Sequence, residues 1–572
     1  MQVALFNNQK IIQKRNSQQR NSSDSTTFSG TGNNFLNKVS KPLQALDANP
    51  IVGVIVLDIL TAIAPNTIID TFKRNAAQGF ETFRRESSGL IINCLLPGIA
   101  VLTVAYAMKK KILGEEFKHI PVHKVWANTN SIDEGVRNWK KVSHMQNKED
   151  RIRAFVEKSF ENIQDDEKSF AKIGTIEEQK QAAECKKEAI DKLVKEILNP
   201  EVKKETGFKK FMKDVKGLVP GHKDESINVE INPKKLNELH DIFAKAYGSS
   251  KNVVIKISKG DTLSTNMKNH IRNTFSFASA FDDKAIKPDN IDKFAEKMKK
   301  LVKGKTLITM LGVGALALSM QAINRAITEK STGRKGYSGY KNLDGGDIQT
   351  PEDKAKLDIG KLVSSAWFLS LGFLSMGKLT TPGKFDFAAP RTTVDQARTL
   401  SLTTDVGRVA AADETTELKD TTVRDTIIFL NLYVVGDYVN KMAVEGIQKW
   451  YKSKKNIDLN LFNEAPKLDK NAGPIKKFFN WVQGKSIKSF EEIEGTVAKG
   501  AEKQLRKNIV TASTLLSLGY SLGALGIAAP LLIAHMTNKN REKELAEAKR
   551  RKAQMSSFEN SSKPTLKANT VK

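Results

Sequence analysis

The chain has 572 residues, with 92 Lys and Arg against 64 Asp and Glu, a formal net charge of +28 at pH 7. Mean hydropathy is negative, so the apolar residues must be concentrated in particular segments, and a uniformly apolar bundle is excluded. The two cysteines, Cys94 and Cys185, lie far apart in unrelated contexts, which excludes a disulfide framework and is typical of a reducing compartment.

A basic excess has three common explanations: nucleic acid, anionic lipid, or the positive-inside bias around membrane spans. Here the basic residues flank apolar runs, which favours the last two. Nucleic-acid binding is not expected, because the basic residues of the polar regions are mixed with acids and no reader motif is present. The expected partners are the lipid bilayer and anionic lipids, together with self-association or a protein partner.

The N-terminal region is polar. Residues 1–40 are rich in Asn, Ser, Gln and Thr and are predicted to be disordered, because they bury too little apolar surface to offset the entropy of ordering. No signal peptide is expected, since the first residues lack an apolar core and a cleavage site. Residues 41–111 are predicted to form membrane and interfacial helices. They include an interfacial helix at 68–83 and a strong span at 90–108, kinked at Pro97.

The first apolar run, residues 51–64, is a marginal span. Its nine Ile, Leu and Val residues gain about as much transfer free energy as the central Asp58 costs, roughly 2.5–3.5 kcal/mol, and Pro65 is expected to end it. Asp58 is a candidate intramembrane acid, because ionisable residues inside a membrane are usually functional. The plainer interpretation is a packed helix with Asp58 turned toward water. No Lys, Arg or His in another apolar run offers this carboxylate a partner.

Residues 112–304 differ in composition from their surroundings and are predicted to form a soluble, mostly helical insert. Short segments rich in β-branched residues, 227–231 and 253–258, flank one helix and indicate a small βαβ-like unit. The helices expected in the insert lie at 150–173, 176–198, 233–247 and 289–302.

The region after the insert returns to apolar composition. Residues 305–378 are predicted to form a membrane helical hairpin, with strong spans at 306–323 and 361–376 and a polar, Gly-rich loop at 328–357. Residues 379–508 are predicted to contain interfacial amphipathic helices and linkers. Their apolar stretches are a marginal span at 427–435, followed closely by Asp437, and basic amphipathic segments at 474–482 and 487–497.

Residues 509–536 are predicted as the final span, and 537–572 as a basic tail. The stretch 510–536 has 27 residues without one Asp, Glu, Lys or Arg, more than the ~20 residues that cross a bilayer as a helix. The expected fold class is mainly α: a multi-span helical membrane protein with four strong and two marginal apolar helices and a soluble insert. Six crossings place both termini and the insert on one side, and so do four crossings with both marginal runs lying in the interface, which is slightly preferred. The basic tail indicates that this side is the cytoplasm, at an inner- or plasma-type membrane.

The sharpest catalytic match is a literal G-x-S-x-G from Gly519 to Gly523. A nucleophile elbow needs a strand turning into a helix, followed by an acid and a His. This motif lies inside an apolar run, and no acid stands between Ser521 and His535. The glycines are better explained as a small-residue face for helix packing, formed by Gly519, Gly523 and Gly526.

Two other motifs lack residues that the corresponding phosphate- or zinc-binding site requires. Gly304-Lys305-Thr306 resembles the end of a phosphate-binding loop, but Lys299 stands where that loop needs a Gly. His119 and His123 lack the Glu of a zinc-binding helix. The loop at 333–347 could wrap an ion, but its plainer interpretation is a flexible connection. No catalytic, cofactor or metal residues are predicted, and the chain is not expected to be an enzyme.

The function expected from these features is a non-enzymatic membrane scaffold that engages partners or anionic lipid through its insert and basic tail. The first alternative is a transporter or channel component that uses Asp58. The second is a soluble protein that stores hydrophobic hairpins for later insertion, as pore-forming proteins do. The absence of a catalytic constellation and the scarcity of acids in the apolar runs favour the scaffold. If it is correct, Asp58→Leu should improve insertion and leave function intact.

Overall fold

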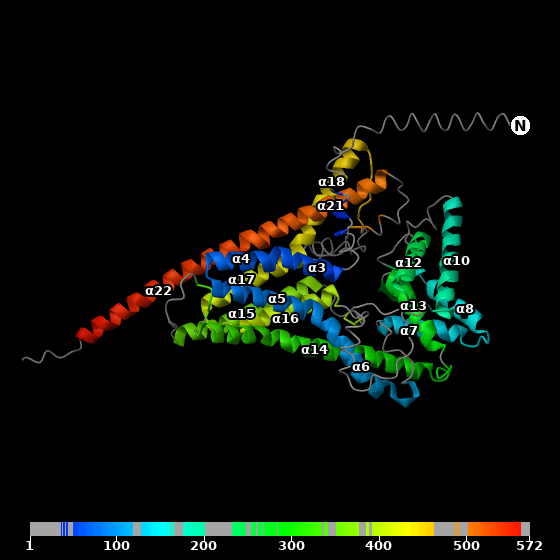
Figure 1. Ribbon diagram of the computed structural model, residues 1–572, viewed down its shortest axis with the longest axis horizontal. Helices are drawn as coiled ribbons and strands as arrows, with labels where there is room; N and C mark the ends of the chain where they lie inside the picture. Colours follow the sequence, from blue (N-terminus) through cyan, green and yellow to red (C-terminus); the bar gives the residue numbers. More distant parts are fainter. Residues whose placement is uncertain are drawn as a thin grey trace, which may run out of the picture.

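The structure is a computed structural model that places long helices side by side in a bundle, with a smaller group of elements at one end (Figure 1). Apart from short gaps within these ranges and a few isolated positions elsewhere, the residues it describes are 50–117, 129–164, 176–200, 231–247, 253–333, 337–340, 351–376, 385–462 and 501–561. The predicted disordered segment 1–40 and the amphipathic segments 474–482 and 487–497 lie almost entirely outside these residues.

The chain enters the bundle through α3 (Pro50–Asp58), a π-helical turn η1 (Ile59–Ile63) and α4 (Ala64–Lys73). The prediction that Pro65 ends the first apolar run is wrong, because the helix continues to Lys73. Proline lacks an N–H and crowds the carbonyl four residues before it. The wider π-turn immediately upstream lets the helix accept this residue without breaking.

The chain then reverses at Asn75 and returns through α5 (Ala76–Leu90), the π-turn η2 (Ile91–Leu95) and α6 (Leu96–Phe117). The side chain of Asn75 caps α5 by accepting from the backbone N–H of Gln78 at 2.8 Å. The predicted single interfacial helix at 68–83 is therefore wrong. Its apolar stripe is divided between two helices that pack against each other.

The second half of the bundle begins with α14 (Ile291–Thr332), a helix of 42 residues that starts in the insert and runs the length of the bundle. It is followed by α15 (Pro351–Met376), α16 (Val394–Ala410), and the continuous run of α17 (Thr415–Leu430), η4 (Asn431–Val435) and α18 (Gly436–Lys455). The last helical run comprises α21 (Ala501–Ser521), η5 (Leu522–Ala528) and α22 (Ala529–Ser561).

Five helices of the described chain are long and apolar enough to cross a membrane, which agrees with the predicted multi-span helical class. They are Ile51–Lys73, Ala76–Lys109, Ile291–Thr332, Thr415–Lys455 and Glu502–Arg551. Both runs predicted as marginal belong to these candidate spans. The run predicted as strong at 361–376 does not, since α15 is not among the five.

The insert lies at one end of the bundle, and α22 leaves at the other (Figure 1). If the bundle crosses a membrane along its length, the end of α22 and the insert lie on opposite sides. That arrangement would differ from the predicted one, with both termini and the insert on one side, which stays a prediction.

The insert is built from α7 (Thr129–Val142), α8 (Lys148–Glu161), α10 (Ile176–Leu198), α12 (Pro233–Tyr247) and α13 (Met267–Phe281). An antiparallel sheet of order β1-β2-β3 comprises Ile163–Gln164, Val253–Ser258 and Asp261–Thr265. The predicted strand at 253–258 is thus confirmed as β2, and both of its neighbours in the sheet, β1 and β3, run antiparallel to it. The other strand of the predicted βαβ-like unit, 227–231, lies outside the described residues except for its last position.

One apolar core joins the insert helices to the first turns of α14. Aromatic rings fill it, and those of Phe160 and Phe243 stack at 4.1 Å between centroids. The helices predicted at 176–198 and 233–247 are confirmed with those bounds. Their apolar residues recur on one face, and that face is what the core buries.

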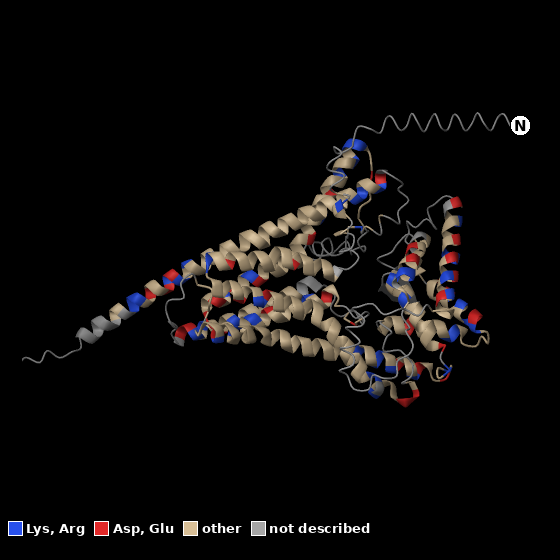
Figure 2. Ribbon diagram, viewed as in Figure 1, with Lys and Arg blue, Asp and Glu red and all other residues tan. Residues whose placement is uncertain are grey.

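The bundle has the opposite distribution, with apolar side chains outside and charged ones inside. On α5, Phe80 and Phe83 are 57% and 48% exposed, while their neighbours Glu81 and Arg85 are both only 6% exposed. On α4, Phe72 is 82% exposed and Asp70 is fully buried. Figure 2 shows charged residues throughout the insert and within the bundle, at the part remote from the insert. A bundle surrounded by lipid is expected to have this arrangement.

Candidate functional site

A small polar cavity lies inside the bundle, between α3, α5 with η2, α16, and α17 with η4. Its volume is about 40 Å³. The polar and charged residues that line it are Asp58, Glu86, Asn93, Cys94, Ser401, Thr404, Asp405, Arg408, Asp425 and Tyr433. The cavity brings together segments that are more than 300 residues apart in the sequence, from α3 and from α16 and α17.

Arg408 is the central cation of this cavity. Its Nη1 lies 2.9 Å from Oδ1 of Asp425, and its Nη2 lies 3.2 Å from Oε2 of Glu86. A third carboxylate, Asp405, lies 3.8 Å from the same Nη1. All four side chains are less than one-tenth exposed. One guanidinium therefore lies within 4 Å of three buried carboxyl groups.

The carboxyl groups around the cavity outnumber the cations. Glu86 has a second partner, since Nη2 of Arg85 lies 2.9 Å from its Oε1. Asp58 also lines the cavity and has no ion pair among the described residues, although the charges of Glu86 and Arg408 act on it. With Asp405 and Asp425, four carboxyl groups face two guanidinium groups. The site thus attracts positive charge.

One carboxylate oxygen in this cluster lacks a partner. Oδ2 of Asp425 is buried and accepts no hydrogen bond from the described residues. A buried carboxylate oxygen without a donor is costly. A proton, a water molecule or a cation in the cavity would satisfy it.

The cavity walls come from helices interrupted by π-turns. Asp58 immediately precedes η1, Cys94 belongs to η2, and Tyr433 belongs to η4. A π-turn widens the helix and leaves a backbone carbonyl without its usual partner, and such turns are frequent at functional sites. Here the hydroxyl of Thr392 donates to the carbonyl oxygen of Cys94 at 2.8 Å. The irregular backbone is therefore stabilised from a neighbouring segment.

The final helical run contributes the fourth π-turn, η5, which packs on the first. Gly526 of η5 lies so close to η1 that a Cβ there would stand 3.1 Å from the carbonyl oxygen of Thr61 and from Cγ of Pro65. Just before η5, the hydroxyl of Ser521 accepts from Nδ2 of Asn431 in η4 at 3.1 Å. The π-turns η1, η2, η4 and η5 of the described chain thus surround one region of the bundle.

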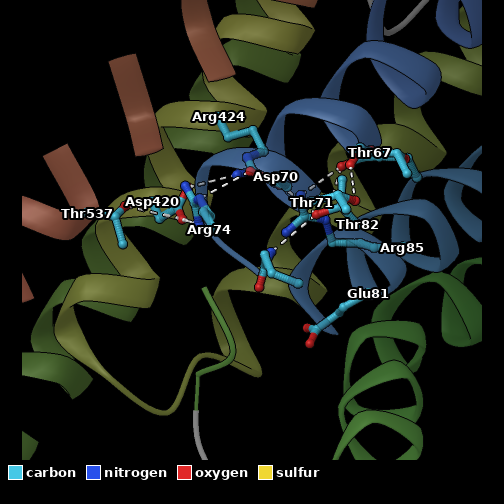
Figure 3. A network of polar contacts seen from close by, with 12 residues as sticks. Thr67, Asp70, Thr71, Arg74, Glu81, Thr82, Arg85, Asp420, Arg424 and Thr537 are labelled. Atoms are coloured by element: carbon cyan, nitrogen blue, oxygen red, sulfur yellow. Dashed lines mark hydrogen bonds and ion pairs between the residues drawn. The ribbon is translucent and has the colours of Figure 1, made fainter. Parts of the chain in front are cut away.

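A second charge cluster joins residues of α4, α5 and α17 (Figure 3). Nε of Arg74 lies 3.1 Å from Oδ1 of Asp70, and its Nη1 lies 2.7 Å from Oδ2 of Asp420. Arg424 lies 3.1 Å from Asp70, which also accepts from the hydroxyl of Thr82 at 2.7 Å. The two acids and two arginines balance, so this cluster carries no net charge.

Helix α17 connects the two clusters and continues to the bundle end. Its residues Glu417, Asp420 and Arg424 recur three or four positions apart and therefore share one face, and Asp425 directly follows Arg424. Glu417 pairs with Arg325 of α14, which also pairs with Asp413. The side chain of Asp413 is 54% exposed. Charged groups thus occur along α17 from the cavity to the surface, in separate ion-paired groups.

A short loop segment, residues 337–340, contacts the charged residues of α4 and α5. Tyr337 and Tyr340 are buried, and the hydroxyl of Ser338 donates to Oε2 of Glu81 at 2.6 Å. The hydroxyl of Tyr337 accepts from Arg74 at 2.8 Å. The prediction of a flexible connection at 333–347 is wrong for this segment. Most of the rest of that loop lies outside the described residues.

The predictions about Asp58 can be compared with the structure. Asp58 does line a cavity, but the expectation that no basic residue lies near it is wrong, since Arg408 faces the same cavity. Arg408 lies in the region assigned to interfacial helices and linkers. The only local signals for it were charged residues at helical spacing and the Thr-x-x-Gln capping box at Thr393 and Gln396.

The three glycines of the predicted packing face differ in their surroundings. Gly526 is buried against η1, as described above. Gly519 and Gly523 are exposed, and a Cβ at either position would meet nothing within 4 Å. Those two glycines do not bring helices of this chain together. Ser521 between them lies within continuous helix, so the G-x-S-x-G match is no nucleophile elbow.

Among the described residues, no three His, Cys, Asp or Glu side chains are grouped so that they could hold a metal ion. Asp437 lies outside the cavity and pairs with Lys441 at 2.6 Å. The arrangement as a whole is an acid-rich cavity connected to the surface by ion pairs, within helices whose outer faces are apolar. Comparison of the chain with protein-family models, curated proteins and solved structures found no match.

Proposed function

We propose that the protein is a membrane-embedded transporter or channel component that admits a small cation to its polar cavity, either a proton or a monovalent ion. The observation that carries this proposal is the excess of carboxyl groups around the cavity, together with the unpartnered Oδ2 of Asp425. Ionisable groups inside a membrane are costly, and they are typical of ion pathways and proton relays.

The size of the cavity supports a small substrate. Its volume is about 40 Å³, whereas sites for organic ligands usually occupy about 300–1,000 Å³. A water molecule needs at least ~10–15 Å³ measured in the same way. The cavity therefore has room for an ion with a few waters.

The series of charged groups on α17 supports access from one side. It leads from Asp425 through Asp420 and Glu417 to the exposed Asp413. It contains carboxyl and guanidinium groups in ion pairs, and chains of ionisable groups inside a membrane are typical of proton relays. The described residues show no comparable series from the cavity toward the insert, so passage on that side would require the helices to move.

A scaffold role, expected from the sequence, stays a prediction. The insert has its own apolar core and is the part of the chain that would bind a protein partner. A simple anchor, however, has no need for four carboxyl groups around an internal cavity. The pore-forming alternative also stays a prediction, and alkaline carbonate extraction would test it, because an inserted bundle remains in the membrane pellet.

The proposed function is tested by ion flux in liposomes that contain the purified full chain. Proton uptake is followed with an entrapped pH-sensitive dye, and Na⁺ and K⁺ uptake with ion-sensitive dyes, under an imposed membrane potential. We expect one of these fluxes in the wild type and a loss of on the order of tenfold or more in Asp425→Asn.

The matched control is Asp358→Asn, which makes the same chemical change at an exposed position of α15. This variant should conduct like the wild type. If the wild type shows no flux above empty liposomes, or if both variants conduct equally, the proposed function is wrong. Thermal unfolding of each variant in detergent shows whether the loss of flux merely reflects loss of folded protein.

A further inference from the structure

A groove lies on α14 where the insert meets the bundle. Its volume is about 630 Å³, and its described lining consists of Glu296, Lys299, Lys300, Lys303, Gly304 and Leu307. Lys299 pairs with Asp133 at 2.8 Å. Lys300 and Lys303 are exposed and have no ion pair within the described part of the chain. The groove therefore presents two unpaired positive charges, and it is far larger than the polar cavity.

The groove lies at the boundary of the apolar surface of α14. Lys300, Lys303, Leu307 and Leu311 follow one another three or four residues apart, so they share one face of the helix. Leu307 and Leu311 are 60% and 64% exposed. The lysines thus lie next to the first exposed apolar turn, which is where lipid phosphates lie around a membrane helix.

The same face continues beyond Leu311 with open space beside the helix at Gly314. Gly314 is one turn beyond Leu311, and a Cβ at this position would meet nothing within 4 Å. Leu318, one turn further, is 46% exposed. A phosphate held by the lysines would place an acyl chain along Leu307, Leu311 and the space at Gly314.

We propose that this face of α14 is a binding site for an anionic phospholipid, with the headgroup phosphate on Lys300 and Lys303 and one acyl chain along Leu307 to Leu318. Basic pockets next to membrane helices bind anionic headgroups in this way. Glu296 and the pairing of Lys299 with Asp133 keep the rest of the groove close to neutral. A zwitterionic lipid, whose headgroup carries its own cation, gains less from the two lysines. This inference does not depend on the proposed transport function.

The test measures the thermal stability of the purified full chain in neutral detergent as phosphatidylglycerol or phosphatidylcholine is added. We expect phosphatidylglycerol to raise the unfolding temperature at lower lipid concentration than phosphatidylcholine. In Lys300→Gln/Lys303→Gln the apparent affinity for phosphatidylglycerol should fall by about fivefold per lysine, roughly 25-fold in total. High salt should weaken the binding of phosphatidylglycerol to the wild type, and the difference in affinity between the wild type and the lysine variant should therefore shrink.

The control variant is Lys187→Gln/Lys195→Gln, which removes two exposed lysines from α10 of the insert. It should bind phosphatidylglycerol as the wild type does. A second variant, Gly314→Leu, fills the acyl position without changing charge, and its affinity should also fall. Because a Cβ at Gly314 would meet nothing within 4 Å, Leu should not impair folding.

Free glycerol phosphate supplies the same anion without acyl chains and should not stabilise the protein. Stabilisation by glycerol phosphate equal to that by phosphatidylglycerol would overturn the lipid assignment in favour of a site for a soluble phosphate. An unchanged affinity in the lysine variant or in Gly314→Leu would overturn it as well.

Discussion

The guanidinium of Arg408 lies 2.9 Å from Asp425, and both side chains are buried between helices whose outer faces are apolar. The pair joins α16 to α17, and through Glu86 it joins both helices to α5. A buried ion pair is no strong evidence for stability, because the desolvation of both charges offsets much of their attraction. Arg408 has three carboxyl neighbours, however, and its removal leaves all of them without this cation.

Replacing Arg408 should therefore strongly destabilise the bundle. We expect Arg408→Gln to lower the free energy of unfolding by about 3–5 kcal/mol, the usual cost of leaving a buried charge without its partner. Thermal unfolding in detergent measures the loss. Adding Asp425→Asn to this variant should restore part of it, because one of the unpaired carboxylates is then removed. Additive losses in the double variant would show that the two side chains are not coupled.

Substitution of Asp58 distinguishes a membrane anchor from a transporter. Asp58→Leu should raise stability in detergent by about 1–3 kcal/mol, which is part of the roughly 2.5–3.5 kcal/mol that a charge costs at the centre of an apolar membrane helix, because Asp58 has no ion pair among the described residues. If the cavity carries a cation, the same variant should lose flux in liposomes. The isosteric Asp58→Asn separates loss of charge from change of shape. Wild-type flux in both variants would favour the anchor role expected from the sequence.

The sequence predicts features that depend on local composition and periodicity. The apolar run at 510–536 and the insert helices at 176–198 and 233–247 are of this kind, and each corresponds to a helix in the structure. The cavity is different, because Arg408 is more than 300 residues from Glu86 and no local pattern connects them. Charged residues three or four apart on a helix have the same spacing as a solvent-exposed face. Only the packing of α17 shows that this face is buried.

The prediction that the first helix ends at Pro65 was wrong for a different reason. A proline after a short apolar run usually marks the end of a helix. The π-turn η1 that allows the helix to continue depends on the close packing of Gly526 of η5, far along the chain. Such tertiary compensation leaves no signal near residue 65.

Gly526 should consequently tolerate substitution much less well than the two glycines before it. A side chain at Gly526 would contact Thr61 and Pro65 of the first helical run, so Gly526→Leu should cost about 1–3 kcal/mol as overpacking. At Gly519 and Gly523 the space is open, and Leu should be neutral or stabilise the helix by up to ~1 kcal/mol. Thermal unfolding of the three single variants gives the comparison. If Gly519→Leu or Gly523→Leu destabilises the protein instead, those glycines pack against a second copy or another partner.

The insert offers a prediction about pH that is independent of the membrane. Burial raises the pKa of Glu134 to about 7, although Asn138, Arg137 and Lys141 act in the opposite direction. Burial of the ring against Phe160 also lowers the pKa of His270 to about 4, although the carbonyl oxygen of Ser159, 2.9 Å from its Nε2, acts in the opposite direction. Both side chains are therefore neutral in the folded insert over an interval in which both are charged in the unfolded chain.

The two groups act in opposite directions as pH changes. The unfolded chain has lost the proton of Glu134 above its ordinary pKa of 4.5, so this group reduces stability as pH rises from 4.5 to about 7. The unfolded chain binds a proton on His270 below 6.5, so this group reduces stability as pH falls from 6.5 to about 4. The two effects nearly cancel between about pH 4.5 and 6.5, where the insert of the wild type should have an almost constant stability.

Single substitutions should expose each effect. In Glu134→Gln the stability of the insert should increase with pH between about 4.5 and 6.5, by roughly 2–3 kcal/mol in all. In His270→Gln it should decrease over the same interval. Hydrogen exchange of the amides of α7, α8 and α13 in the full chain reports this stability without requiring the insert to be excised, once rates are corrected for intrinsic pH dependence. Parallel pH profiles in the wild type and both variants would show that neither group is neutral in the folded insert.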